Sequence, residues 1–169
     1  VYASCTCGLV NRNGVLLNMN ETVNALSNIG PCVIKRTRDS DSGRDVAIVD
    51  FKDGRDIESG KSVKSIVESM GGEWVCQERV HQHESIDKLY PESVNTLRIV
   101  TYMTDQGVGA CPVTLRIGQG GAKVDNAHAG GIFIYVDNDG YLGDEAVTEY
   151  QKRFIKHPDT EIPFKGRWL

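Results

Sequence analysis

Short apolar runs separated by turn signals open the chain. Residues 9–17 have the pattern of a β-hairpin that turns at Asn13-Gly14, a dipeptide with a strong preference for two-residue hairpin turns. Residues 20–28 then place apolar side chains at helical spacing, and Asn20 can cap this helix. The pattern predicts a hairpin followed by a short helix.

The rest of the chain alternates β-rich runs with polar turns. Residues 32–35 and 46–51 read as two strands, Ser59 can cap a helix that ends at Gly71-Gly72, and residues 74–80 read as a further strand. Residues 97–103, 113–117 and 131–136 complete the set of predicted strands, the last turning at residues 137–140. This order predicts an α+β fold without a regular βαβ repeat.

Charge and composition exclude some classes of function. The net charge of −4 argues against a general nucleic-acid binder, which needs a clustered positive surface. No apolar run approaches the roughly 20 residues of a membrane helix, and the start of the chain lacks the pattern of a signal peptide. We therefore expect a cytoplasmic protein without a membrane span.

The cysteine pattern favours buried thiols over disulfides. The five cysteines are an odd number, and three of them lie in apolar runs that read as strands. They are Cys5, Cys7, Cys32, Cys76 and Cys111. The closely spaced pair at the start of the chain has no second Cys or His pair, so a zinc site is not predicted.

The first candidate site follows the run that ends in Lys35. A lysine at a strand end can meet a phosphate, and the following loop, with Ser40, Ser42, Gly43 and Arg44, offers hydroxyls and backbone N–H groups to the same anion. The spacing of a Walker motif is absent. An ordinary polar hairpin loop beside an edge lysine remains the alternative.

The second candidate is the end of the run at residues 74–80. Adenine needs a backbone donor, a backbone acceptor and an apolar slot, which a strand entering a linker at Gln77, Glu78 and Val80 supplies. Polar residues on the exposed face of a strand are the alternative explanation.

Two arginines in apolar runs form the third candidate. Arg98 and Arg116 lie in predicted strands, where a guanidinium is costly unless it meets a carboxylate or a phosphate. A shared anion between neighbouring strands is one interpretation, and a separate buried Arg–Asp pair for each is the other. Asp125 precedes Asn126, and alternation along an extended chain would turn Asp125 away from a site that contains Asn126.

Six of these segments, taken in order, resemble the sugar-transfer-associated ATP-grasp family. They are Lys35 with its Ser/Gly loop, Gln77-Glu78, Gln82-His83, residues 94–101, residues 115–118, and Asp125-Asn126 followed by Gly130-Gly131. The resemblance extends from about residue 32 to His157-Pro158.

The resemblance implies a nucleotide held between two α+β subdomains with mainly antiparallel sheets. Residues 1–80 would be the lid subdomain with its lead-in, and residues 81–169 the core subdomain. Lys35 would contact the phosphates of ATP, with Ser40, Ser42, Gly43 and Arg44 as a lid loop. Gln77, Glu78 and Val80 would hold adenine, and His83 would lie near the ribose or phosphates. Arg98, Arg116 and Asn126 would face the γ-phosphate and an acyl phosphate.

One feature of the family is missing from the sequence. ATP-grasp proteins hold Mg²⁺ with acidic residues and an Asn in an acid-x-Asn pattern, which this chain lacks, while residues 137–140 read as a turn. We therefore expect the metal ligands outside this chain, and a core subdomain truncated at its carboxyl end.

The resemblance implies the activity of an ATP-dependent carboxylate ligase, and the family name adds a link to surface polysaccharide or glycan modification. The carboxylate and its nucleophile are open. The alternatives are a catalytically silent nucleotide-binding or scaffolding module, and a protein that binds an anionic sugar without ATP.

Overall fold

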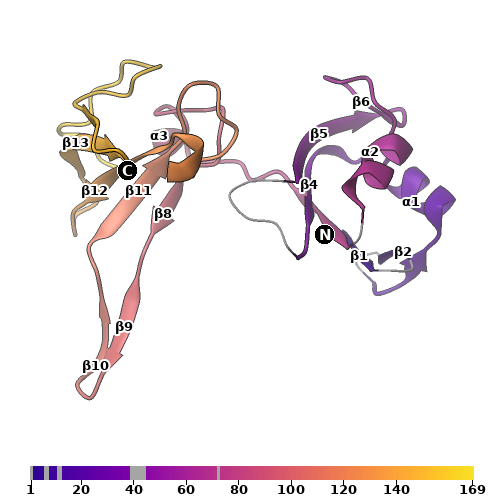
Figure 1. The fold of residues 1–169 in the computed structure, drawn as a ribbon, viewed down its shortest axis with the longest axis horizontal. Coiled ribbons are helices and arrows are strands. Elements are labelled where there is room, and N and C mark those ends of the chain that lie inside the picture. The colour runs from indigo at the N-terminus through magenta and orange to yellow at the C-terminus, as the bar shows by residue number, and fades with distance from the viewer. Residues whose placement is uncertain (1, 6–7, 11–12, 39–44, 72) are drawn as a thin grey trace. The chain divides into compact units, whose positions relative to one another are not determined.

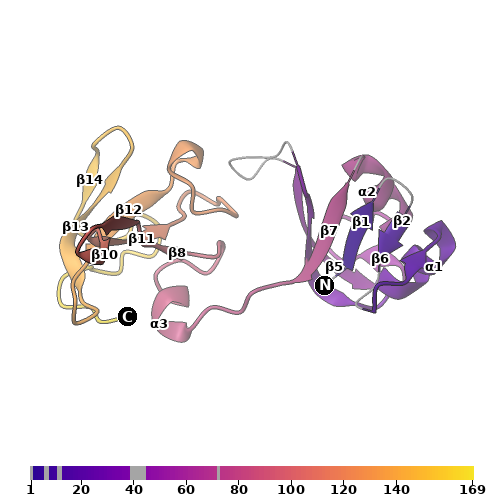
Figure 2. The ribbon, with the colours of Figure 1, turned by 90° about the horizontal axis from the view of Figure 1, so that it is seen from below.

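The computed structural model describes residues 2–5, 8–10, 13–38, 45–71 and 73–169. They form two compact units, Val1–Arg79 and Val80–Leu169, a division one residue before the boundary that we expected. In Figures 1 and 2 the first unit runs from indigo to magenta and the second from pink to yellow. Both units combine antiparallel sheets with short helices, which confirms the predicted α+β class.

An antiparallel sheet with strand order β3-β2-β1-β7-β4-β5-β6 forms the frame of the first unit. Its strands are β1 (Tyr2–Cys5), β2 (Gly8–Val10), β3 (Leu16–Leu17), β4 (Gly30–Arg36), β5 (Val46–Lys52), β6 (Arg55–Asp56) and β7 (Trp74–Glu78). Pairing of β2 with β3 confirms the predicted hairpin at the start of the chain. Its turn uses the positive φ of Gly14, 77°, which glycine adopts without steric cost.

Two helices, α1 (Met19–Leu26) and α2 (Val63–Met70), cover one face of this sheet (Figure 1). Leu26 of α1 and Ile66 of α2 pack with Ile34 and Cys76 of the sheet in a single buried cluster. The other face of β4, β5 and β7 carries only half-buried or exposed side chains among those described.

Both helix caps differ from the sequence prediction. Asn18, not Asn20, caps α1, because its side chain accepts from Glu21 N while the Glu21 carboxylate accepts from Asn18 N. Ser62, not Ser59, caps α2, and the Ser59 hydroxyl instead donates to Asp56. Glu21 thus completes a capping box at the start of α1, and Asp56 engages the serine that was expected to cap α2.

The second unit contains an antiparallel sheet with strand order β14-β13-β12-β11-β8. Its elements are α3 (Glu84–Asp87), β8 (Thr96–Arg98), β9 (Thr101–Thr104), β10 (Gly107–Ala110), β11 (Val113–Ile117), the 3-10 turn η1 (Ala127–Ala129), β12 (Ile132–Val136), β13 (Leu142–Thr148) and β14 (Arg153–Phe154). Strands β9 and β10 form a separate hairpin that projects from β8 and β11 (Figure 1).

The sequence prediction for this unit failed at two places: one predicted strand is interrupted, and one strand was missed. The run at 97–103 is interrupted after Arg98, and its second half pairs with β10 in the projecting hairpin. Strand β13 was not predicted because Asp144 and Glu145 break its apolar pattern, although Leu142 and Ala146 are buried against β12. The turn between Asp137 and Gly140 is confirmed, with Gly140 N donating to Asp137 O at 3.2 Å.

The core of the second unit lies on one face of its sheet. Leu115 and Ile134 point into it, and Leu89, just after α3, and Phe164, after β14, pack against them, both fully buried. Thr114, Arg116 and their cross-strand partners therefore lie on the opposite face.

Candidate functional site

The face of the first sheet away from the helices carries a row of side chains around Lys35. Side chains alternate between the two faces of a strand, so Val33 and Lys35 point away from the core that contains Cys32 and Ile34. Directly paired residues of an antiparallel sheet share a face. Lys35 is paired with Val46 and Val75, and Val33 with Ile48 and Gln77.

Lys35 has no partner on this face within the part of the chain that the structure describes. It is half-buried between valines, and no described residue forms a hydrogen bond or an ion pair with its ammonium group. A partly desolvated cation without a counter-charge is unfavourable by itself. An anionic ligand at this position would interact with the Lys35 ammonium group without competing with an existing ion pair.

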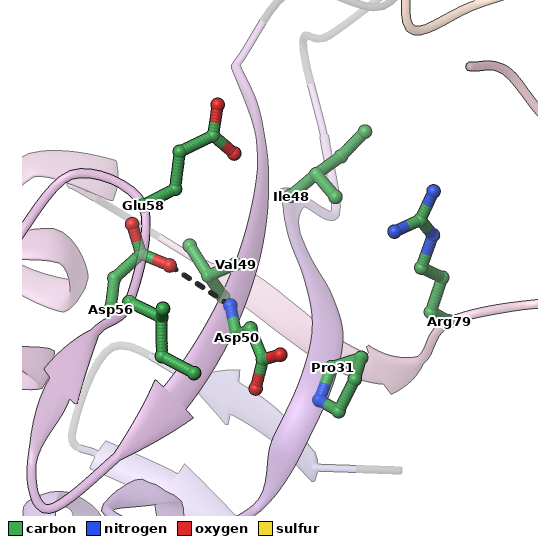
Figure 3. A pocket seen from close by; sticks show the side chains of 8 residues that line it. Pro31, Ile48, Val49, Asp50, Asp56, Glu58 and Arg79 are labelled. Atoms are coloured by element: carbon green, nitrogen blue, oxygen red, sulfur yellow. Dashed lines mark hydrogen bonds between the residues drawn. The ribbon is translucent and has the colours of Figure 1, made fainter.

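A pocket of about 240 Å³ opens near the start of β4 (Figure 3). It is lined by Pro31, Ile48, Val49, Asp50, Asp56, Ile57, Glu58 and Arg79. Its walls combine apolar side chains with acids and one guanidinium, which in Figure 3 extends beside Ile48. Pro31, Ile48 and Asp50 alternate with core residues, so this part of the pocket belongs to the same face as Lys35.

Asp56 shapes the wall of this pocket and is not free to bind. Its carboxylate accepts from Asp50 N at 2.9 Å, from Ser59 N at 2.8 Å and from the Ser59 hydroxyl at 2.5 Å. Burial alone would raise the pKa of Asp56, but these hydrogen bonds to the charged form hold it below its usual value. Asp50, Glu58 and Arg79 remain to meet a ligand.

The other predicted nucleotide contacts have different positions. Gln77 shares the face of Lys35. Glu78 ends β7, is exposed and is paired with Cys32, so it lies on the core side of the sheet. Val80 is exposed and belongs to the second unit. Ser40, Ser42, Gly43 and Arg44 lie outside the described residues, as does the rest of the predicted lid loop.

Arg116 lies at the centre of a hydrogen-bond cluster in the second unit. Its Nη2 forms an ion pair with Asp125 at 3.1 Å, and its Nε and Nη2 donate to the Thr96 hydroxyl at 3.1 and 2.9 Å. Nη1 lies 3.5 Å from Asn126 Oδ1. Thr96 in turn donates to Asp125, which is buried.

This cluster corrects one expectation and leaves another open. Arg116 and Asn126 lie together as expected, but Asp125 also reaches Arg116, so the guanidinium is already compensated. Alternation does not apply here because Asp125 and Asn126 are not in a strand, and Asn126 begins the η1 turn. A site shared by Arg116 and Lys35, which belong to different units, stays a prediction.

Arg98 differs from the sequence prediction of a buried arginine. It is exposed on β8, the edge strand, and no described residue forms an ion pair with it. Its partner Thr114 is two positions from Arg116, so the two arginines share one sheet face. They are neighbours on that face without a common bonded partner.

His83 has a structural role that explains its position. It caps α3, with its Nδ1 2.9 Å from the Ser85 hydroxyl and 3.4 Å from Ser85 N. A role near the ribose or phosphates stays a prediction.

A buried polar network that sequence reasoning missed orders the segment before β8. Asn95 Oδ1 accepts from Ser93 and from Gly118 N, and Asn95 Nδ2 donates to Tyr90 O at 2.8 Å. Gln82 Oε1 accepts from Asn95 N at 2.6 Å. The signal in the sequence was a run of small polar residues before an apolar strand, which does not reveal its distant partners.

The described residues contain no group of three or more His, Cys, Asp or Glu that could hold a metal ion. Within the same residues, no helix combines the length and apolar character needed to cross a membrane.

Comparison with known proteins identifies the family. No curated protein and no solved structure matches the chain. A family model described as sugar-transfer associated ATP-grasp matches residues 6–168, which is nearly the whole chain. The chain belongs to the sugar-transfer associated ATP-grasp family.

Proposed function

We propose that the first unit binds ATP on the free face of its sheet, with the phosphates at Lys35. The observation that supports this most is that Lys35 lies on this face without a partner among the described residues. Pro31, at the pocket, is four residues away along β4, a distance of about 13 Å in a strand. An extended nucleotide is of this order of length, so its base would lie near the pocket.

The chemistry of the two ends supports this orientation. Lys35 offers a cation to the phosphates, whereas Asp50 and Glu58 would repel them. Carboxylates at the pocket end can accept hydrogen bonds from ribose hydroxyls or the adenine amino group, and Ile48 and Pro31 supply apolar surface for the base. Gln77, Glu78 and Val80 would border the base, and Ser40, Ser42, Gly43 and Arg44 would close over the phosphates.

The second unit would supply the groups that meet the reacting phosphate. In an ATP-dependent carboxylate ligase, a carboxylate oxygen attacks the γ-phosphorus of ATP, ADP leaves, and a nucleophile then displaces phosphate from the acyl phosphate. Arg98 has no ion-pair partner among the described residues, while Arg116 is compensated by Asp125 and offers its Nη1 beside Asn126. We therefore assign the main charge stabilisation to Arg98.

The cellular role is proposed from the family description. Association with sugar transfer suggests modification of a polysaccharide or glycan, and a requirement for ATP suggests the cytoplasm.

Titration of a fluorescent ATP analogue tests this proposal. Lys35→Met should raise the Kd about tenfold to a hundredfold, because a hydrogen bond to a charged group contributes about 1.5–3 kcal/mol. Lys64→Met is the matched control, since Lys64 lies on α2, which covers the other face, and forms an exposed pair with Glu68. Equal affinities of all three proteins would contradict the proposal. Binding without ADP release in the presence of substrates would indicate a nucleotide-binding module.

A further inference from the structure

Three side chains form a row across the second sheet on the face opposite its core. Arg98 on β8 and Tyr135 on β12 are both paired with Thr114 on β11, and paired residues share a face. Neighbours in such a row are about 5 Å apart, so the row spans about 10 Å. A single ring-sized ligand can touch all three side chains.

Each member of this row has unused binding capacity. The Arg98 guanidinium is exposed, and neither the Thr114 nor the Tyr135 hydroxyl forms a hydrogen bond with any part of the chain that the structure describes. Tyr135 is 48% exposed, which is unusual for a tyrosine in a central strand. The row therefore offers a cation, a hydroxyl and an aromatic surface.

The surroundings of the row do not cancel its charge. Arg116 in the next row is occupied by Asp125, and the nearby Glu145 of β13 forms an ion pair with Arg153 at 2.7 Å. Phe133, paired with Arg116, adds half-buried aromatic surface beside Tyr135. Positive charge at one end and aromatic surface at the other suit a ligand with an acid group on a ring.

We propose that Arg98, Thr114 and Tyr135 bind a sugar that carries a carboxylate, such as a hexuronic acid. The planar guanidinium binds a carboxylate through two parallel hydrogen bonds, and the tyrosine ring packs against the apolar face of the sugar ring. Thr114 lies between them, where it can bond a ring hydroxyl. This substrate class rests on the proposed function, because the bound carboxylate is the group that ATP would activate.

Saturation-transfer NMR on the full chain tests the proposal with D-glucuronate as the probe. Wild type should bind it more tightly than methyl glucoside, which lacks the charge, and than cyclohexanecarboxylate, which lacks the hydroxyls. Arg98→Met should raise the Kd about tenfold, and Tyr135→Ala about three- to tenfold. Tyr135→Phe should keep most of the affinity, and Arg98→Lys should be intermediate because it retains only the charge.

Two controls remove similar side chains elsewhere. Arg55→Met removes an exposed arginine of the first unit whose Nη1 donates to Gly60 O at 3.0 Å, and Tyr150→Ala removes a tyrosine that is 88% exposed in a turn. Both should bind glucuronate as wild type does. Equal binding of cyclohexanecarboxylate, or losses in the controls equal to those in the row, would overturn the proposal.

The two proposals fail in different ways. Absence of glucuronate binding at millimolar concentration, with ATP binding at Lys35 intact, would overturn the sugar-acid site alone. Glucuronate binding that depends on Arg98 and Tyr135 in a chain that does not bind ATP would support this site and contradict the proposed function.

Discussion

At the residue scale, His157 shows how a titratable group is kept neutral to hold a loop. It is fully buried, stacks on Tyr90 with ring centroids 5.2 Å apart, and lies 2.8 Å from Gly118 O through its Nε2. Its Nδ1 accepts from the backbone N–H groups of Asp159 and Thr160, both at 3.3 Å. Nε2 must therefore carry the proton, and a second proton on Nδ1 would face two donors.

This arrangement predicts that stability falls in weak acid. Burial lowers the pKa of His157, so the unfolded chain binds more protons than the folded chain once the pH drops below the ordinary histidine value of about 6.5. The free energy of unfolding from urea denaturation should fall from pH 7 to pH 5, by at most about 1.4 kcal/mol per pH unit from this group. His157→Gln should flatten this slope, whereas a slope equal to that of wild type would contradict the assignment. His81→Gln, which replaces an exposed histidine, serves as the control.

At the element scale, substitutions at the start of α1 distinguish its two candidate N-caps, Asn18 and Asn20. Asn18→Ala removes the reciprocal hydrogen bonds with Glu21 and should lower the free energy of unfolding by about 1 kcal/mol. Asn20→Ala changes the residue that the sequence pattern favoured, and it should cost much less because Asn20 lies inside the helix and is exposed. Equal losses in urea denaturation would show that Asn18 is not the cap.

Elements with a local signal could be predicted, and those that depend on distant partners could not. The hairpin at Asn13-Gly14 and strand β11 follow from turn chemistry and an unbroken apolar run. Strand β13 could be recognised only from its pairing with β12, because Asp144 and Glu145 interrupt the apolar pattern of its sequence. The buried role of His157 likewise depends on contacts with Gly118, far away in the chain.

The same distinction applies to the candidate site. Lys35 could be singled out because it ends a strand, and the register then places it on the face away from the core. Arg98 and Arg116 looked alike in the sequence, yet one lies on an edge strand and the other contacts Asp125. Strand order determines this difference, and strand order cannot be read from the periodicity of the sequence. The partnership of Arg98 with Tyr135 across Thr114 is set by register in the same way.

At the scale of the whole molecule, each unit has its own core on one face of its sheet and candidate binding residues on the opposite face. In the first unit this face carries Lys35 and part of the pocket, and in the second it carries Arg98 and Arg116. Membership of the sugar-transfer associated ATP-grasp family makes ATP the expected ligand of such a chain. The central claim is that ATP lies on the free face of the first unit.

Amide chemical-shift mapping with ATP titrated into the ¹⁵N-labelled chain tests this claim most directly. The largest changes should fall on residues 31–35, 46–50 and 75–79, which form the face of Lys35 and the adjoining pocket. Helices α1 and α2, which cover the opposite face, should change little. Changes concentrated on these helices, or none at millimolar ATP, would contradict the account.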